Sequence, residues 1–339
     1  MPDDALTMAI PEIRGLAMDA CLACGASSSV ARSLVDATIS AACEGTRDLG
    51  FPHLMDYLAR FRSGGINGQA RPKIQHPLPA LIQVDADGGI AQLGFDIIFE
   101  DYVKRIRTFG VATFTQKNSF TAGELGYYVR RLAAQGILSI AVANGPALMT
   151  VPGSRRKIFC TNPIAFAAPA GPGRKPVVID QASSATAFVK LRSAADEKRS
   201  IPDSWALDGN GQPTTNAAEA IKGALLPFGG YKGANIALMV ELLAAGLSEA
   251  AWSMDGDNFV DDTKRIDAGL TVIGMAPIDT LGFAERLDRY ASRLEDCGVH
   301  VPGRNRDRPL PAHVTVPLVL VEKLKHLALS THPTNDARC

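Results

Sequence analysis

The chain has 339 residues, and its 35 basic and 35 acidic side chains cancel, so no net field favours a nucleic acid or an anionic membrane surface. Hydrophobic residues make up 46% of the composition, enough for a large buried core in one or two domains. The apolar run 233–246 contains a glutamate and is too short for a membrane span. The N-terminus has no signal-peptide pattern. We therefore expect a cytoplasmic protein without nucleic-acid or membrane partners.

The cysteines are too sparse, at six in this length, for a disulfide framework. Cys21 and Cys24 form a C-x-x-C inside an alanine-rich helical pattern, with no second pair of ligands nearby. We expect both to be buried thiols, and we expect no metal site.

The spacing of apolar residues predicts an α/β protein in which helices come first. Helical spacing over 11–63 is interrupted at 25–27 and 45–51, which predicts three helices there. Further helices are expected over 90–110, 124–136 and 279–298, with two more inside 217–247. Strands are expected over 79–89, 111–116, 137–144, 162–170, 175–181 and 267–277.

A nucleotide would need an unusual site, because neither a G-x-G-x-x-G fingerprint nor a Walker A loop is present. Three loops offer backbone N–H groups, hydroxyls or basic side chains suited to phosphate: 118–126, 228–235 and 302–308. A capped helix start, a turn between helices and a solvated loop explain the same segments without a ligand. Asp180 ends a strand, where it either meets ribose hydroxyls or caps a helix from about residue 184.

The segment 45–65 predicts a helix that starts near Pro52 and ends at a glycine pair. Asp48 and His53 stand at its head, and both can hold or move a proton at neutral pH. They are either a cap and a surface histidine or a catalytic pair.

Two motifs are hard to obtain by chance: I-P-x-x-W-A-L-D-x-x-G-x-P-T-T at 201–215 and the G-G-x-K-G helix entry at 229–233. With "NSFTAGELGYY", "CTNPIAFAAP" and "VVIDQASS", they make the chain resemble the malate/L-lactate dehydrogenase type 2 family over about residues 10–330. That family includes ureidoglycolate and sulfolactate dehydrogenases and Δ1-piperideine-2-carboxylate/Δ1-pyrroline-2-carboxylate reductases.

The resemblance implies an α/β fold distinct from the Rossmann fold. A cofactor domain with a large, mainly antiparallel sheet (76–250) would be flanked by a helical N-terminal part (1–75) and by a C-terminal part (251–339) that returns to the helical one. It also implies a homodimer or larger assembly, with NADPH or NADH as the cofactor and a small-molecule substrate.

The resemblance also implies site residues. It puts Thr161 near the substrate. The positions that it assigns to the cofactor, together with the lysine of the glycine-rich loop, are Ser119, Thr121, Ala122, Gly123, Ile179, Asp180, Gln181, Gly230, Tyr231, Lys232, Gly303, Arg304 and Arg306.

The chain departs from the family at the usual catalyst. The family has a Ser-His-Gly run with an arginine three residues later, and here Asp48, Leu49 and His53 stand at the serine, histidine and arginine positions. Thr121 and Tyr231 stand where the family has other histidines. Because leucine cannot transfer a proton, either His53 with Asp48 has taken over the acid/base role, or the protein binds nucleotide without the family's chemistry.

We favour the relocation, because residues four apart on a helix share a face and an imidazole at 53 reaches much of the space around 49. The loss of the arginine leaves the substrate carboxylate without its usual partner, and Lys190 is one substitute. The expected function is NAD(P)H-dependent reduction of a small cyclic α-imino acid such as Δ1-pyrroline-2-carboxylate, or interconversion of a 2-oxo and a 2-hydroxy acid. The alternative is a catalytically silent nucleotide-binding protein of the same fold.

Overall fold

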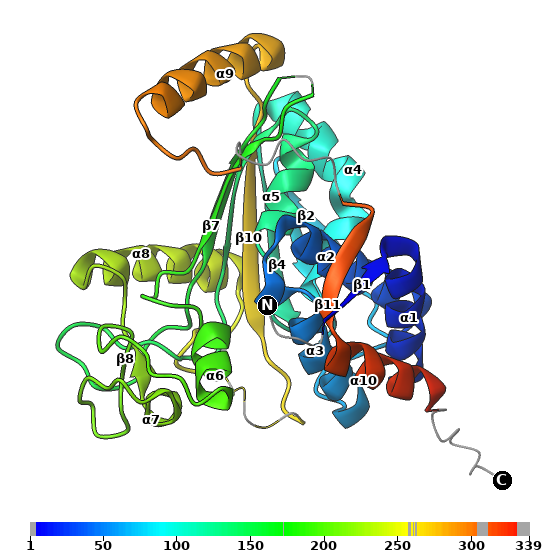
Figure 1. The fold of residues 1–339 in the computed structure, drawn as a ribbon. Helices are drawn as coiled ribbons and strands as arrows, with labels where there is room; N and C mark the ends of the chain where they lie inside the picture. The colour runs from blue at the N-terminus through cyan, green and yellow to red at the C-terminus, as the bar shows by residue number, and fades with distance from the viewer. Residues whose placement is uncertain are drawn as a thin grey trace.

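The computed structural model describes residues 5–171, 173–256, 259, 261, 263–303 and 311–330 of the chain (Figure 1). Its N-terminal part contains the three expected helices, α1 (Ile10–Ala23), α2 (Ser28–Glu44) and α3 (Phe51–Ser63). Ser27 caps α2 by accepting a hydrogen bond from the N–H group of Val30. Gly45 and Gly64 adopt left-handed conformations that end α2 and α3. The predicted interruptions therefore coincide with real caps.

The end of the chain returns to this helical part. Strand β11 (His313–Pro317) pairs in antiparallel fashion with β1 (Ala5–Ala9), and α10 (Leu318–Leu329) packs on α1. Cys21 and Cys24 are buried in the shared hydrophobic core, and burial raises the pKa of Cys21 to about 12. The sequence did not predict β1, β11 or α10.

Among the described residues, seven strands form a sheet at the centre of the molecule, in the order β2-β3-β4-β10-β5-β6-β7. In this set the β3–β4 pair is parallel and the other five neighbouring pairs are antiparallel. The strands are β2 (Lys73–Leu78), β3 (Leu81–Asp85), β4 (Val111–Ser119), β5 (Leu138–Ala143), β6 (Ile164–Ala168), β7 (Val177–Gln181) and β10 (Ala268–Met275). The α/β prediction is confirmed, and the sheet is mixed.

Helices cover both faces of this sheet (Figure 1). On one face, α4 (Ala91–Phe109) and α5 (Gly126–Ala133) bury a core rich in aromatic side chains. On the other, α8 (Tyr231–Glu241) and its π-helical continuation, Leu242–Gly246, pack over β5 and β10. Helix α9 (Thr280–Asp296) lies at the far end of the sheet, at the top of Figure 1.

A smaller hydrophobic cluster lies beside the sheet and brings α6 towards α3. It contains α6 (Phe188–Asp196), α7 (Ala217–Lys222), and the short strands β8 (Ala206–Leu207) and β9 (Ala224–Leu225). Helix α6 begins at Phe188, so the expected helix from about residue 184, with Asp180 as its cap, is wrong.

The domain boundaries expected at 75 and 250 stay a prediction. Strand β10 comes from beyond residue 250, yet it lies in the middle of the sheet, between β4 and β5. The helices in the described part of the chain include none long and apolar enough to cross a bilayer.

Candidate active site

Helix α3 presents His53 on the side that faces the sheet. Gly50 precedes the helix, Pro52 occupies its first turn, and Leu54 and Leu58 are buried in the helical core. This burial fixes the rotation of the helix. The His53 side chain is consequently largely covered, with 13% of its surface exposed.

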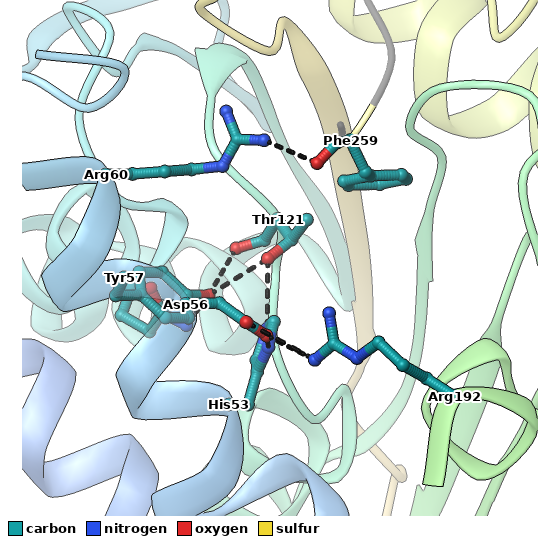
Figure 2. A network of polar contacts seen from close by, with 8 residues as sticks. His53, Asp56, Tyr57, Arg60, Thr121, Arg192 and Phe259 are labelled. Atoms are coloured by element: carbon teal, nitrogen blue, oxygen red, sulfur yellow. Dashed lines mark hydrogen bonds and ion pairs between the residues drawn. The ribbon is translucent and has the colours of Figure 1, made fainter. Parts of the chain in front are cut away.

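Both ring nitrogens of His53 have partners (Figure 2). Nδ1 lies 3.1 Å from Oδ2 of Asp56, and Nε2 lies 3.2 Å from Oγ1 of Thr121. An ionised carboxylate only accepts hydrogen bonds, so Nδ1 carries a hydrogen and donates it to Asp56. In the neutral ring, Nε2 then accepts from Thr121; in the imidazolium it becomes the acidic N–H group.

Asp56 is held from the other side by Arg192, which comes from α6 (Figure 2). Nη2 of Arg192 donates to Oδ2 at 3.0 Å and to Oδ1 at 3.3 Å. Burial acts to raise the pKa of Asp56, but the hydrogen bond with His53 and the charge of Arg192 outweigh it, so the pKa is lowered overall. Asp56 therefore stays ionised at neutral pH and stabilises a positive charge on His53.

The expected contact between Asp48 and His53 is wrong. Among the described residues, no hydrogen bond or ion pair joins them, and the carboxylate at Nδ1 belongs to Asp56. Asp48 lies in the 3-10 turn Arg47–Leu49, before α3 begins. Asp56 lies three residues after His53, on the same helical face, which explains why it makes the contact instead.

Tyr57 fixes the loop that carries Thr121. Its hydroxyl donates to the carbonyl oxygen of Thr121 at 2.8 Å and lies 3.2 Å from that residue's hydroxyl. Burial raises the pKa of Tyr57 to about 12, so it remains a neutral donor. At the end of β4, the Ser119 hydroxyl is buried and donates to the carbonyl oxygen of Ala268, and in the loop that follows, the carbonyl of Ala122 accepts from Tyr128 and Gln92. These side chains hold the loop in place.

Arg60 is engaged in structural contacts rather than in the site. It is 2% exposed, its guanidinium donates to the carbonyl oxygens of Phe259, Asp261 and Lys264, and it lies over the ring of Phe120. Figure 2 shows it directed away from His53.

The start of α5 was one expected phosphate site. The structure fills it with a side chain of the protein itself, because the N–H group of Gly126 donates to Oδ2 of Asp180 at 2.7 Å. Burial of this carboxyl group raises the pKa of Asp180 to about 6, with Glu124 adding to the rise. The expectation of a free anion site at this helix start is therefore wrong.

The turn before α8 is open. Gly229 and Gly230 both have positive φ, +57° and +65°, and a Cβ added to either would meet nothing within 4 Å. Tyr231 and Lys232 are exposed, and α8 has no side-chain cap at its N-terminus. Free backbone N–H groups beside a lysine suit a phosphate group.

The edge strand β7 lies between the start of α5 and the turn before α8. Ile179 and Gln181 are exposed along it. The N–H group of Val178 donates to Pro302 at 3.2 Å, and a Cβ on Gly303 would lie 2.4 Å from the carbonyl oxygen of Pro176. Gly303 therefore lets its loop lie against β7. Arg304 and Arg306 lie outside the described residues.

The two predicted substrate residues lie in different surroundings. The carbonyl of Thr161 accepts from the N–H group of Ser183 at 2.8 Å, in the segment that follows β7. Lys190 is exposed on α6. Asp56 and Arg192 are not among the predicted site residues. The spacing of Asp56 from His53 is a signal that the sequence contains, whereas Arg192 reaches α3 only through the tertiary fold.

The comparisons with known proteins agree on one family. The malate/L-lactate dehydrogenase model matches residues 8–308. A Δ1-pyrroline-2-carboxylate/Δ1-piperideine-2-carboxylate reductase of Pseudomonas putida is 34% identical over 290 residues, 84% of each protein. A (2R)-3-sulfolactate dehydrogenase (NADP(+)) of Chromohalobacter salexigens is 32% identical over 329 residues, which covers 95% of this chain and 98% of that protein. The crystal structure of Δ1-piperideine-2-carboxylate reductase from Pseudomonas syringae pathovar tomato superposes with a TM-score of 0.89 at 31% identity, covering 95% of this chain and 99% of that one.

The chain is therefore an oxidoreductase. It belongs to the malate/L-lactate dehydrogenase family of NAD(P)-dependent enzymes, and the resemblance seen in its sequence motifs is confirmed.

Proposed function

We propose that the protein uses NADPH or NADH to reduce a small cyclic α-imino acid such as Δ1-pyrroline-2-carboxylate, with a 2-oxo acid as the second substrate class. The names of the relatives support both classes, and His53 bonded to Asp56 is the observation that carries the proposal.

The proposed role of His53 is to supply the proton. When bound, the nicotinamide cofactor would supply the hydride for the carbon next to the carboxylate. Nε2 of the imidazolium then gives its proton to the imine nitrogen, or to the carbonyl oxygen of a 2-oxo acid, and the ring becomes neutral. Asp56 orients the ring and stabilises the charged form before transfer.

The described residues fit a dinucleotide. The open turn at Gly230, with Tyr231 and Lys232 behind it, would hold the pyrophosphate, and the exposed edge of β7 at Ile179 and Gln181 would lie beside the ribose and nicotinamide. This assignment puts the cofactor against a mainly antiparallel sheet, unlike the parallel sheet of a Rossmann fold. Ser119, Ala122, Gly123, Asp180, Gly303, Arg304 and Arg306 complete the proposed cofactor site, and Thr161 the substrate site.

We also infer a homodimer or larger assembly in the cytoplasm. The family resemblance suggests the assembly, and the exposed apolar side chains Leu238, Met239 and Leu242 on α8 and its continuation support it.

The test is to follow oxidation of NADPH and NADH by absorbance over a panel of cyclic imino acids and 2-oxo acids. We expect turnover with Δ1-pyrroline-2-carboxylate or a close analogue, and no turnover with any member of the panel would contradict the proposal.

The second candidate, a catalytically silent nucleotide-binding protein, is favoured by Leu49 at the position of the family's histidine. Calorimetry separates the two: that candidate requires NADPH to bind while no panel member is reduced.

A further inference from the structure

The guanidinium of Arg192 has spare hydrogen-bonding capacity. Its two contacts with Asp56 both use Nη2. A guanidinium has five N–H donors in a planar fork, and those on Nε and Nη1 have no partner among the described residues. The side chain is 46% exposed, so part of it can contact a ligand.

The packing of α6 fixes where Arg192 lies. Leu191 and Ala194 are buried in the cluster beside the sheet, at 1% and 0% exposure. Their burial sets the rotation of α6 and leaves Arg192 directed across to α3, as Figure 2 shows. Lys190 is exposed on the same helix, and among the described residues no hydrogen bond or ion pair joins it to His53 or Asp56.

Arg192 and His53 share one hydrogen-bond acceptor, a carboxylate oxygen of Asp56. Nη2 of Arg192 and Nδ1 of His53 both bond Oδ2 of Asp56, at 3.0 and 3.1 Å. Asp56 neutralises one of the two positive charges that this group holds when His53 is protonated. A second anion is then favoured beside the guanidinium.

The chemistry of the substrate requires such an arrangement. In a cyclic 2-imino acid or a 2-oxo acid, the atom that accepts the proton and the carboxylate are attached to the same carbon. A residue that protonates the first must therefore lie close to the residue that binds the second. Arg60 cannot serve, because backbone carbonyls and Phe120 hold it away from His53.

We propose that Arg192 binds the substrate's carboxylate through its free N–H groups while Nη2 stays on Asp56. This inference rests on the proposed function. It assigns to Arg192, in place of Lys190, the role of the family's arginine, which is absent at position 53. The fork geometry suits a planar carboxylate better than a lysine ammonium does.

The first test measures binding alone. Pyrrole-2-carboxylate, a planar ring with the same carboxylate, is titrated by calorimetry into the complex of the protein with NADPH. We expect R192Q to raise its Kd by about 10- to 100-fold, the usual range for a lost charge-assisted hydrogen bond. R192K should recover part of the loss. The control R199Q removes another exposed arginine, which pairs with Glu197, and should change the Kd less than about twofold.

The second test compares turnover of Δ1-pyrroline-2-carboxylate with that of Δ1-pyrroline, the same ring without the carboxylate. R192Q should raise KM for the first by a similar factor and lower kcat/KM for the second by a clearly smaller factor, because only the contact with Asp56 is lost there. Equal losses on both rings would mean that Arg192 only positions Asp56, and would overturn the inference. An unchanged Kd for pyrrole-2-carboxylate in R192Q would overturn it too. Turnover by the wild-type protein tests the proposed function separately, and its presence would support that function whatever the result with R192Q.

Discussion

At the scale of single residues, the site depends on one carboxylate. Asp56 contacts the proposed proton donor on one side and the proposed substrate anchor on the other. Its lowered pKa means that the ionised form stabilises the folded protein above about pH 4, and that this contribution is lost as the pH falls through the folded value. Turnover at this site should therefore be measured well above about pH 4, where Asp56 is ionised.

Replacing Asp56 by asparagine should lower kcat by about 10- to 100-fold, since a charge-assisted hydrogen bond is lost. A neutral amide also accepts the Nδ1 hydrogen bond less strongly than a carboxylate does, so the ring is oriented less well. The rate of NADPH oxidation at saturating substrate measures the loss. D48N is the matched control, and a larger effect from D48N than from D56N would contradict the assignment.

The difference between Asp48 and Asp56 shows what residue patterns can supply. The sequence pointed to His53 because it stands one turn from the position of the family's histidine. It did not identify the orienting carboxylate, because the choice between Asp48 and Asp56 depends on where α3 begins. Arg192 could not be predicted from the sequence, because 136 residues separate it from Asp56 and only the fold brings them together.

At the scale of elements, the sequence predicted most of the helices and the inner strands, whose signals are local. Capping residues and left-handed glycines mark the ends of α2 and α3. The pairing of β1 with β11 joins the two ends of the chain, and local spacing carries no information about it. The same limit applies to Asp180, which caps α5 from a distant strand.

The start of α8 is the element that we expect to bind the pyrophosphate. Replacing Lys232 by glutamine should raise the Kd for NADPH by about three- to tenfold, and the difference should shrink at high salt because the lysine is exposed. Calorimetric titration at two salt concentrations measures this. K222Q, which removes an exposed lysine on α7, is the control. Equal affinities in K232Q and the wild type would contradict the assignment.

The loop at Gly303 should be intolerant of a side chain. Gly303 and Gly298 have similar positive φ angles, +88° and +77°, but a Cβ at 303 would lie 2.4 Å from Pro176, whereas one at 298 would meet nothing within 4 Å. We expect G303A to lower the free energy of unfolding by about 1–3 kcal/mol more than G298A does. Urea denaturation of both variants gives the comparison, and equal losses would show that the close contact is absent.

At the scale of the whole molecule, we expect self-association. Light scattering of a dilute solution should give at least twice the monomer mass of 35.9 kDa. The monomer mass at every concentration tested would contradict this expectation.

The proton donor that we propose for this oxidoreductase is His53, one helical turn from the position of the family's histidine. The most direct measurement is the turnover of H53A with NADPH and Δ1-pyrroline-2-carboxylate, beside H76A, which removes an exposed histidine on β2. We expect H53A to lose about 10²- to 10⁴-fold in kcat, with the Kd for NADPH nearly unchanged, and H76A to match the wild type. Near-full turnover by H53A would contradict the claim.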